Sequence, residues 1–166
     1  MNWLLPVGGA LAVAVLLLGS SGDNVSDDKR TTEQLAVMVR IRAEALKQGV
    51  PVELALATAE AESNFRNVKA TNGASYGPLQ VHKSHLLPGE AESVLLNMDV
   101  SIPRGITILR NLLARAGGDP IEMRVMYFCG PYYRTKGSCS DESIARTKSR
   151  WAPVAARWGV KAAYPV

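Results

Sequence analysis

The sequence predicts a mostly α-helical domain preceded by one apolar N-terminal helix. Apolar residues recur every three or four positions over several stretches, and glycine or proline stands between those stretches. The alternation of apolar and polar residues that is typical of strands is nearly absent. A chain of 166 residues is long enough for one domain but not comfortably for two. We therefore expect an apolar segment at 1–22, a polar tether at 23–30 and a single helical domain at 31–166.

The N-terminal segment has the length of a membrane span. Residues 1–22 carry no charged side chain. As a helix they would cover about 30 Å, the thickness of a bilayer core. We expect a signal anchor that meets the membrane through residues 3–22, with a cleaved signal peptide as the alternative. The domain would then be periplasmic and held at the inner membrane, or exported.

End signals predict the first two helices of the domain. Thr31 or Thr32 can cap a helix that stops at Gly49. Pro51 suits the first turn of a second helix, which runs to about Asn64.

The middle of the domain is predicted to hold a loop and a weak helix. Residues 66–80 are polar and contain two glycines and a proline, which indicates a loop with room for a short hairpin. A weak helix is expected over 86–96.

Three further helices are predicted in the C-terminal half. The first begins at Ser101 or Pro103 and continues through Ala116, and the second covers 120–128. Asp141 can cap the last one, which we expect Pro153 to interrupt.

The two cysteines, Cys129 and Cys139, are predicted to form a disulfide. They follow an export segment, and disulfides persist in oxidising compartments. Their spacing, with no histidine nearby, argues against a metal site. Closing so short a loop would stabilise the fold by roughly 2–3 kcal/mol.

The net charge of +4 suits an anionic partner such as a cell wall, nucleic acid or an acidic membrane surface. The basic residues are spread along the chain without a dense run, which argues against nucleic acid.

Glu62 is the first candidate for chemistry. It lies near the end of the second predicted helix. Glu53 and Glu60 fall on the opposite side of that helix, where we expect them to face solvent. Four small or apolar residues lie within about 60° of it: Ala55, Thr58, Ala59 and Phe65. A carboxyl in such surroundings can stay protonated and donate a proton to a leaving oxygen. Composition alone favours the alternative of an ordinary glutamate at a helix end.

Motifs around Glu62 change that balance. Four follow one another along the chain: Glu62-Ser63-Asn64-Phe65, then Ser75, Gly77, Leu79 and Gln80, then Ile102, Gly105, Ile106 and Leu109, and finally Tyr127 and Gly130. In order and spacing they resemble the motifs of the soluble lytic transglycosylase and goose-type lysozyme superfamily, which includes small transglycosylases of secretion, conjugation and phage systems. The resemblance covers about residues 33–135. Pro78, Ser101 and Phe128 depart from the family pattern and put substrate contacts in question.

The resemblance implies a lysozyme-like fold and a lytic transglycosylase that acts on peptidoglycan glycan strands. Glu62 would act as acid and then as base, releasing a 1,6-anhydro product. Ser63 and Ser75 would bond near the acid or the sugar. Gln80 would line the glycan groove, and Tyr127 would reach toward Glu62.

No second carboxylate is assigned, and this favours transglycosylation over hydrolysis. Asp99 and Glu92 are candidates, but no motif places either beside Glu62. A hydrolytic muramidase and a non-catalytic wall-docking component stay open as alternatives. The setting would be a local opening in the wall, made for a secretion or conjugation machine or for phage entry, with a virion membrane as an alternative location.

No cofactor or metal is expected. His82 and His85 stand three apart without a third ligand nearby. Trp151 and Trp158 share a helix face, so we expect core packing in preference to sugar stacking.

Overall fold

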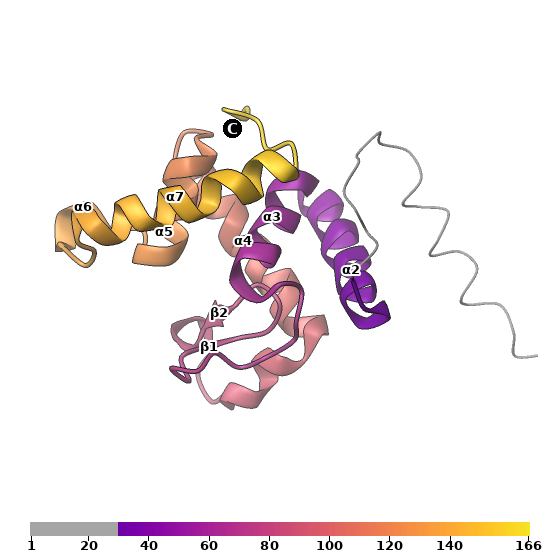
Figure 1. The fold of residues 1–166 in the computed structure, drawn as a ribbon. Helices are drawn as coiled ribbons and strands as arrows, with labels where there is room; N and C mark the ends of the chain where they lie inside the picture. Colours follow the sequence, from indigo (N-terminus) through magenta and orange to yellow (C-terminus); the bar gives the residue numbers. More distant parts are fainter. Residues whose placement is uncertain (1–29) are drawn as a thin grey trace, which may run out of the picture.

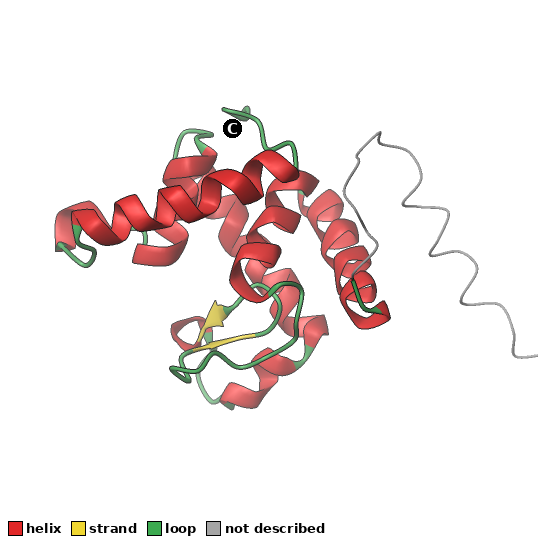
Figure 2. Cartoon of the chain, viewed as in Figure 1, coloured by secondary structure: helices red, strands yellow, loops and turns green. Residues whose placement is uncertain are grey.

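The computed structural model describes residues 30–166, which are mostly helical as the sequence predicts (Figure 1). They form six α-helices and one sheet of two short strands, which Figure 2 shows beside the helical layers. The predicted anchor at 1–22 and residues 23–29 of the predicted tether lie outside the described residues.

Among residues 30–166, no helix is both long and apolar enough to cross a bilayer.

The first two helices begin and end where the sequence predicts. In α2 (Thr32–Gln48), the Thr31 hydroxyl accepts from the Gln34 amide at 3.2 Å, and the Gln34 side chain accepts from the Thr31 amide at 2.8 Å. This reciprocal cap satisfies two amides that the helix itself cannot bond. Gly49 ends α2 at φ 70°, a conformation that favours glycine. Helix α3 (Val52–Ser63) follows Pro51 and ends at Asn64.

The segment after α3 folds back on itself. Strands β1 (Ser75–Tyr76) and β2 (Val81–His82) pair antiparallel, and the 3₁₀ turn η2 (Lys83–His85) follows. The helix predicted over 86–96 is wrong for its first half, because only η3 (Glu92–Leu96) forms, as a 3₁₀ helix. Pro88 and Gly89 account for the difference, since Gly89 adopts φ +84° and the chain cannot continue a helix through it.

Both internal prolines are tolerated in helices, which corrects two predicted boundaries. Helix α4 (Met98–Arg115) starts before Ser101, with Asn97 as its cap, and contains Pro103. Helix α7 (Asp141–Arg157) starts after the cap Ser140 and runs through Pro153 without interruption. Each proline frees the carbonyl four residues earlier, at Asp99 and at Ser149. Both of those residues are exposed, so water can satisfy the carbonyl.

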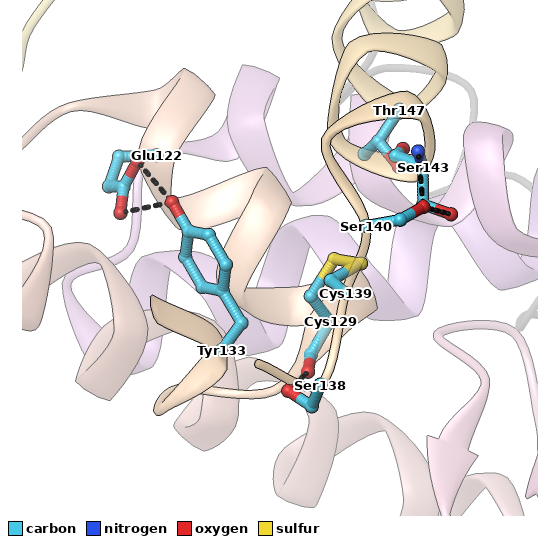
Figure 3. The surroundings of a disulfide bond; sticks show 8 residues. All are labelled: Glu122, Cys129, Tyr133, Ser138, Cys139, Ser140, Ser143 and Thr147. Atoms are coloured by element: carbon cyan, nitrogen blue, oxygen red, sulfur yellow. Dashed lines mark hydrogen bonds between the residues drawn. A yellow bond between two sulfur atoms is a disulfide. The ribbon is translucent and has the colours of Figure 1, made fainter. Parts of the chain in front are cut away.

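The disulfide between Cys129 and Cys139 is present, as predicted (Figure 3). It joins the end of α5 (Pro120–Cys129) to the residue before Ser140, across the short helix α6 (Tyr133–Lys136), which the sequence did not predict. The Ser138 hydroxyl donates to the Cys129 carbonyl at 3.1 Å inside the closed loop.

The helices share one core. Helix α3 packs against α2 and α7, and α4 packs against α2 and α5 (Figure 1). Trp151 is 2% exposed, which confirms its core position, and Trp158 meets the buried Phe65 ring edge-on at 5.9 Å.

Helix α4 also supports the turn between the strands. A Cβ on Gly105 would lie 2.7 Å from Leu79 Cδ1, so only glycine allows the turn to approach this closely. Gly77 lies against Ser101 in the same way, at φ +77°. The two glycines of the predicted motifs therefore fix the position of the loop that follows α3.

Candidate active site

A cavity of about 570 Å³ opens beside the end of α3. Its volume falls within the range of small-molecule sites. Residues singled out in the sequence line it, among them Glu62, Ser75, Gln80, Tyr127 and Cys129. The wall comes from α3, the strand pair, α4 and α5, so residues far apart in sequence meet there.

A second cavity of about 350 Å³ adjoins the first on the α7 side. Glu62 and Phe128 line both cavities, so these two residues lie where the cavities meet. Among the described residues that line either cavity, Glu62 is the only acid.

Glu62 is placed by the way α3 ends. Asn64 and Phe65 both adopt positive φ, 53° and 59°, and turn the chain sharply after the helix. The Ser63 hydroxyl, which is buried, donates to the Pro78 carbonyl at 2.7 Å. It also accepts from the Arg66 amide at 3.1 Å. Ser63 therefore ties the helix end to the turn and does not line either cavity.

Arg124 forms an ion pair with Glu62 that the sequence reasoning missed. The Arg124 guanidinium lies 5.6 Å from the Trp151 ring centre and 5.9 Å from that of Tyr127. The side chains are 17% exposed for Glu62 and 10% for Arg124. The surroundings of Glu62 therefore include a cation and are not only apolar as expected. The sequence feature that could have indicated this pair is the position of Arg124, a basic residue one helical turn before Tyr127 in a largely apolar helix.

Tyr127 lies in the first cavity but points its hydroxyl elsewhere. The hydroxyl donates to the carbonyl of Leu79 and so holds the turn on α5. Burial raises the pKa of Tyr127, and the negative charge of Glu62 raises it further. The hydroxyl therefore stays protonated near neutral pH and remains a donor.

Gln80 and Ser75 offer polar atoms to the cavity. Gln80 adopts φ 48°, and its amide nitrogen donates to the carbonyls of Val68 at 3.0 Å and Gly77 at 2.8 Å. Within residues 30–166, neither the Gln80 amide oxygen nor the Ser75 hydroxyl has a hydrogen-bond partner, so both can serve a ligand.

Glu53 and Glu60, the other acids of α3, do not both face solvent. The prediction that Glu60 is exposed is wrong. Its carboxylate is 11% exposed and accepts from Arg30, Arg157 and the Trp158 ring nitrogen. Glu53, which is half-buried, accepts from the Tyr164 hydroxyl at 3.0 Å. These bonds connect α3 to α7 and to the C-terminal segment. The helical angles alone had predicted that both carboxylates face solvent.

The two carboxylates considered as partners of Glu62 lie away from both cavities. Asp99 pairs with Arg40 on the surface. Glu92 accepts from the Tyr76 hydroxyl, which lowers its pKa, with Lys83 adding to the effect.

Both histidines border the first cavity. Burial lowers the pKa of His85, and the charge of His82 lowers it further. Within the part of the chain that the structure describes, no three His, Cys, Asp or Glu side chains gather into a metal-binding group.

Comparison with family models, curated proteins and solved structures finds no match to this chain. The functional assignment therefore depends on the geometry around Glu62.

Proposed function

We propose that this protein is a peptidoglycan lytic transglycosylase with a lysozyme-like fold. It would cleave the β-1,4 bond between N-acetylmuramic acid and N-acetylglucosamine. The supporting observation is the position of Glu62, the only acid that lines the two joined cavities within residues 30–166. Most glycoside hydrolases use two carboxylates, one on each side of the scissile bond. A groove with one carboxylate suits a reaction in which the same group acts twice.

The proposed reaction balances with Glu62 alone. The protonated carboxyl gives its proton to the glycosidic oxygen, and the bond from that oxygen to the muramoyl C1 breaks. The muramoyl 6-hydroxyl then bonds to C1 and closes the 1,6-anhydro ring. Its proton returns to the Glu62 carboxylate, so no water is consumed and Glu62 is ready again. The substrate acetamido group can stabilise the positive charge at C1.

Polar atoms beside Glu62 suit the positioning of a sugar. The Gln80 amide oxygen can accept from a sugar hydroxyl, and the Ser75 hydroxyl can donate or accept. Ser63 and Tyr127 support the site indirectly, because both bond backbone carbonyls of the turn that carries Gln80.

The setting we propose is the wall side of a membrane. Residues 3–22 would hold the protein at the inner membrane, with the domain in the periplasm, or would direct its export. The disulfide suits an oxidising compartment. A local opening made there would serve a secretion or conjugation machine, or phage entry from a virion.

Mass spectrometry of digested peptidoglycan tests the proposal. We expect 1,6-anhydro muropeptides from the wild type and none from Glu62→Gln, with the circular dichroism spectrum unchanged. Asp99→Asn is the matched control, because this carboxylate is 74% exposed and lies outside both cavities. Products with a reducing end would show a hydrolytic muramidase. Cleavage of peptidoglycan that persists in Glu62→Gln would show that the catalytic acid is another residue.

The ion pair with Arg124 favours a second candidate, a wall-binding module without activity. The guanidinium occupies the Glu62 carboxylate, which has to face a glycosidic oxygen if it is to act as the acid. In that case neither the wild type nor Glu62→Gln would clear peptidoglycan in a gel, while both would sediment with it.

A further inference from the structure

The second cavity is lined by an excess of positive charge. Three arginines contribute to it, Arg124 from α5 and Arg146 and Arg150 from α7, against the single acid Glu62. The remaining wall is mainly small or apolar and includes Trp151 and Val154. Such a wall lowers the local dielectric constant and strengthens the attraction of these cations for an anion.

Two of these arginines have donors to spare. Arg124 is 8% exposed, and its Nε is buried without a hydrogen-bond partner, although its Nη1 pairs with Glu62. Arg150 is exposed, and its guanidinium has no ion-pair partner among residues 30–166. Because the Nε of Arg124 is enclosed by protein, an anion in the cavity would meet the outer guanidinium nitrogens of Arg124.

The third arginine is already paired. Arg146 bonds Glu142 at 2.5 Å, one turn earlier on α7, and both side chains are more than half exposed. Glu142 does not line the cavity, so this pair leaves the positive charge at its mouth only partly neutralised.

We propose that this cavity binds a carboxylate carried by the N-acetylmuramic acid of the substrate, on its peptide or on its lactyl group. This inference rests on the proposed function, because it assumes that the glycan lies in the first cavity. Glu62 lines both cavities, so a sugar bound beside it would bring its substituent to the arginines. Planar guanidinium groups match a carboxylate with paired hydrogen bonds.

The test is calorimetric binding of glycan strands to full-length Glu62→Gln, which binds without cleaving if the proposed function holds. Intact strands are compared with strands whose carboxylates have been converted to methylamides. We expect the dissociation constant to rise about tenfold on neutralisation, as for the loss of a charged hydrogen bond. Adding Arg150→Gln should weaken binding of intact strands by a similar factor and remove the difference between the two ligands.

Lys148→Gln in the Glu62→Gln background is the matched control, because Lys148 is also exposed on α7 but borders a different cavity. It should bind both ligands as Glu62→Gln does. Hydrolysis of the amide that holds the peptide gives strands whose only carboxylate is the lactyl group, which is uncharged in peptide-bearing units. Tight binding of these strands would assign the cavity to the lactyl carboxylate of units without peptide, and weak binding would assign it to a carboxylate of the peptide.

Equal binding of intact and neutralised strands by Glu62→Gln would overturn the inference, as would unchanged binding after Arg150→Gln. The measurement does not depend on cleavage. If binding depends on the carboxylates but the wild type does not cleave, the proposed reaction is wrong and this inference stands. If the wild type cleaves but binding does not depend on charge, this inference is wrong and the proposed reaction stands.

Discussion

Leu79 packs on Gly105 so closely that a Cβ at position 105 would lie 2.9 Å from Leu79 Cβ. Leu79 is fully buried, and its carbonyl accepts from the Tyr127 hydroxyl. The turn before Gln80 is thus held between α4 and α5. Its position, and with it the part of the cavity wall that Gln80 forms, depends on the absence of a side chain at Gly105.

Gly105→Ala should destabilise the fold by about 1–3 kcal/mol, because the added methyl group overlaps a packed side chain. The better helix propensity of alanine offsets only part of this loss. Urea denaturation gives the free energy of unfolding. Leu79→Ala in the same chain removes the overlap with Leu79 Cδ1 and leaves the one with Cβ, so the double variant should lose somewhat less stability than the sum of the two single losses. Strict additivity would show that the two residues do not meet.

Removing Arg124 leaves Glu62 without its cation in a largely enclosed site. Loss of one member of a fully buried pair costs about 3–5 kcal/mol, and this pair is partly exposed, so we expect about 1–3 kcal/mol for Arg124→Ala. In a double-mutant cycle, Glu62→Gln should recover part of that loss. Arg146→Ala is the comparison, because its exposed pair with Glu142 should contribute under about 1 kcal/mol. An Arg124→Ala loss that Glu62→Gln leaves unchanged would contradict a direct pair.

The disulfide should stabilise both the fold and the cavity wall. Cys129 lines the first cavity, and the bond closes a loop across a separation of 10 residues. Replacing both cysteines by serine should lower the free energy of unfolding by roughly 2–3 kcal/mol. Dithiothreitol should destabilise the wild type by a similar amount and leave the serine variant unchanged. Equal stability of the two proteins without reductant would argue against the constraint.

The parts of the fold that follow from local signals could be predicted from the sequence. Thr31, Gly49 and the cysteine pair act through neighbours in the chain, and all three behave as predicted. Pro103 and Pro153 misled the prediction, because whether a helix tolerates proline depends on the exposure of a carbonyl four residues earlier.

The candidate site shows the same limit. The sequence motifs singled out Glu62, Ser75, Gln80 and Tyr127, and all four line one cavity in the structure. The partner Arg124 lies 62 residues from Glu62 in the chain, and no motif or helical angle relates the two. Contacts of this kind are set by how α3 and α5 pack against the other helices, which a single sequence does not reveal.

The last prediction concerns acid stability and the pair between Glu90 and Arg104. Arg104 donates to the Glu90 carboxylate at 2.8 and 3.0 Å, and the Leu87 amide adds a bond at 2.7 Å. These bonds, the Arg104 contribution first, lower the pKa of Glu90 from 4.5 to about 2. The folded protein therefore binds this proton less readily than the unfolded chain. The stabilisation is complete above pH 4.5 and is lost as the pH falls toward 2.

Glu90→Gln should accordingly lower the midpoint of thermal unfolding at pH 7 and leave it close to the wild-type value near pH 2, where the carboxyl of the folded wild type is about half protonated and most of its stabilisation is lost. Glu33→Gln is the control for the substitution itself, because this exposed carboxylate has no ion-pair partner within residues 30–166. An equal loss at both pH values for Glu90→Gln would mean that glutamine fits the site poorly. The stabilisation would then come from packing, because the bonds from Arg104 and from the Leu87 amide both favour the ionised carboxylate.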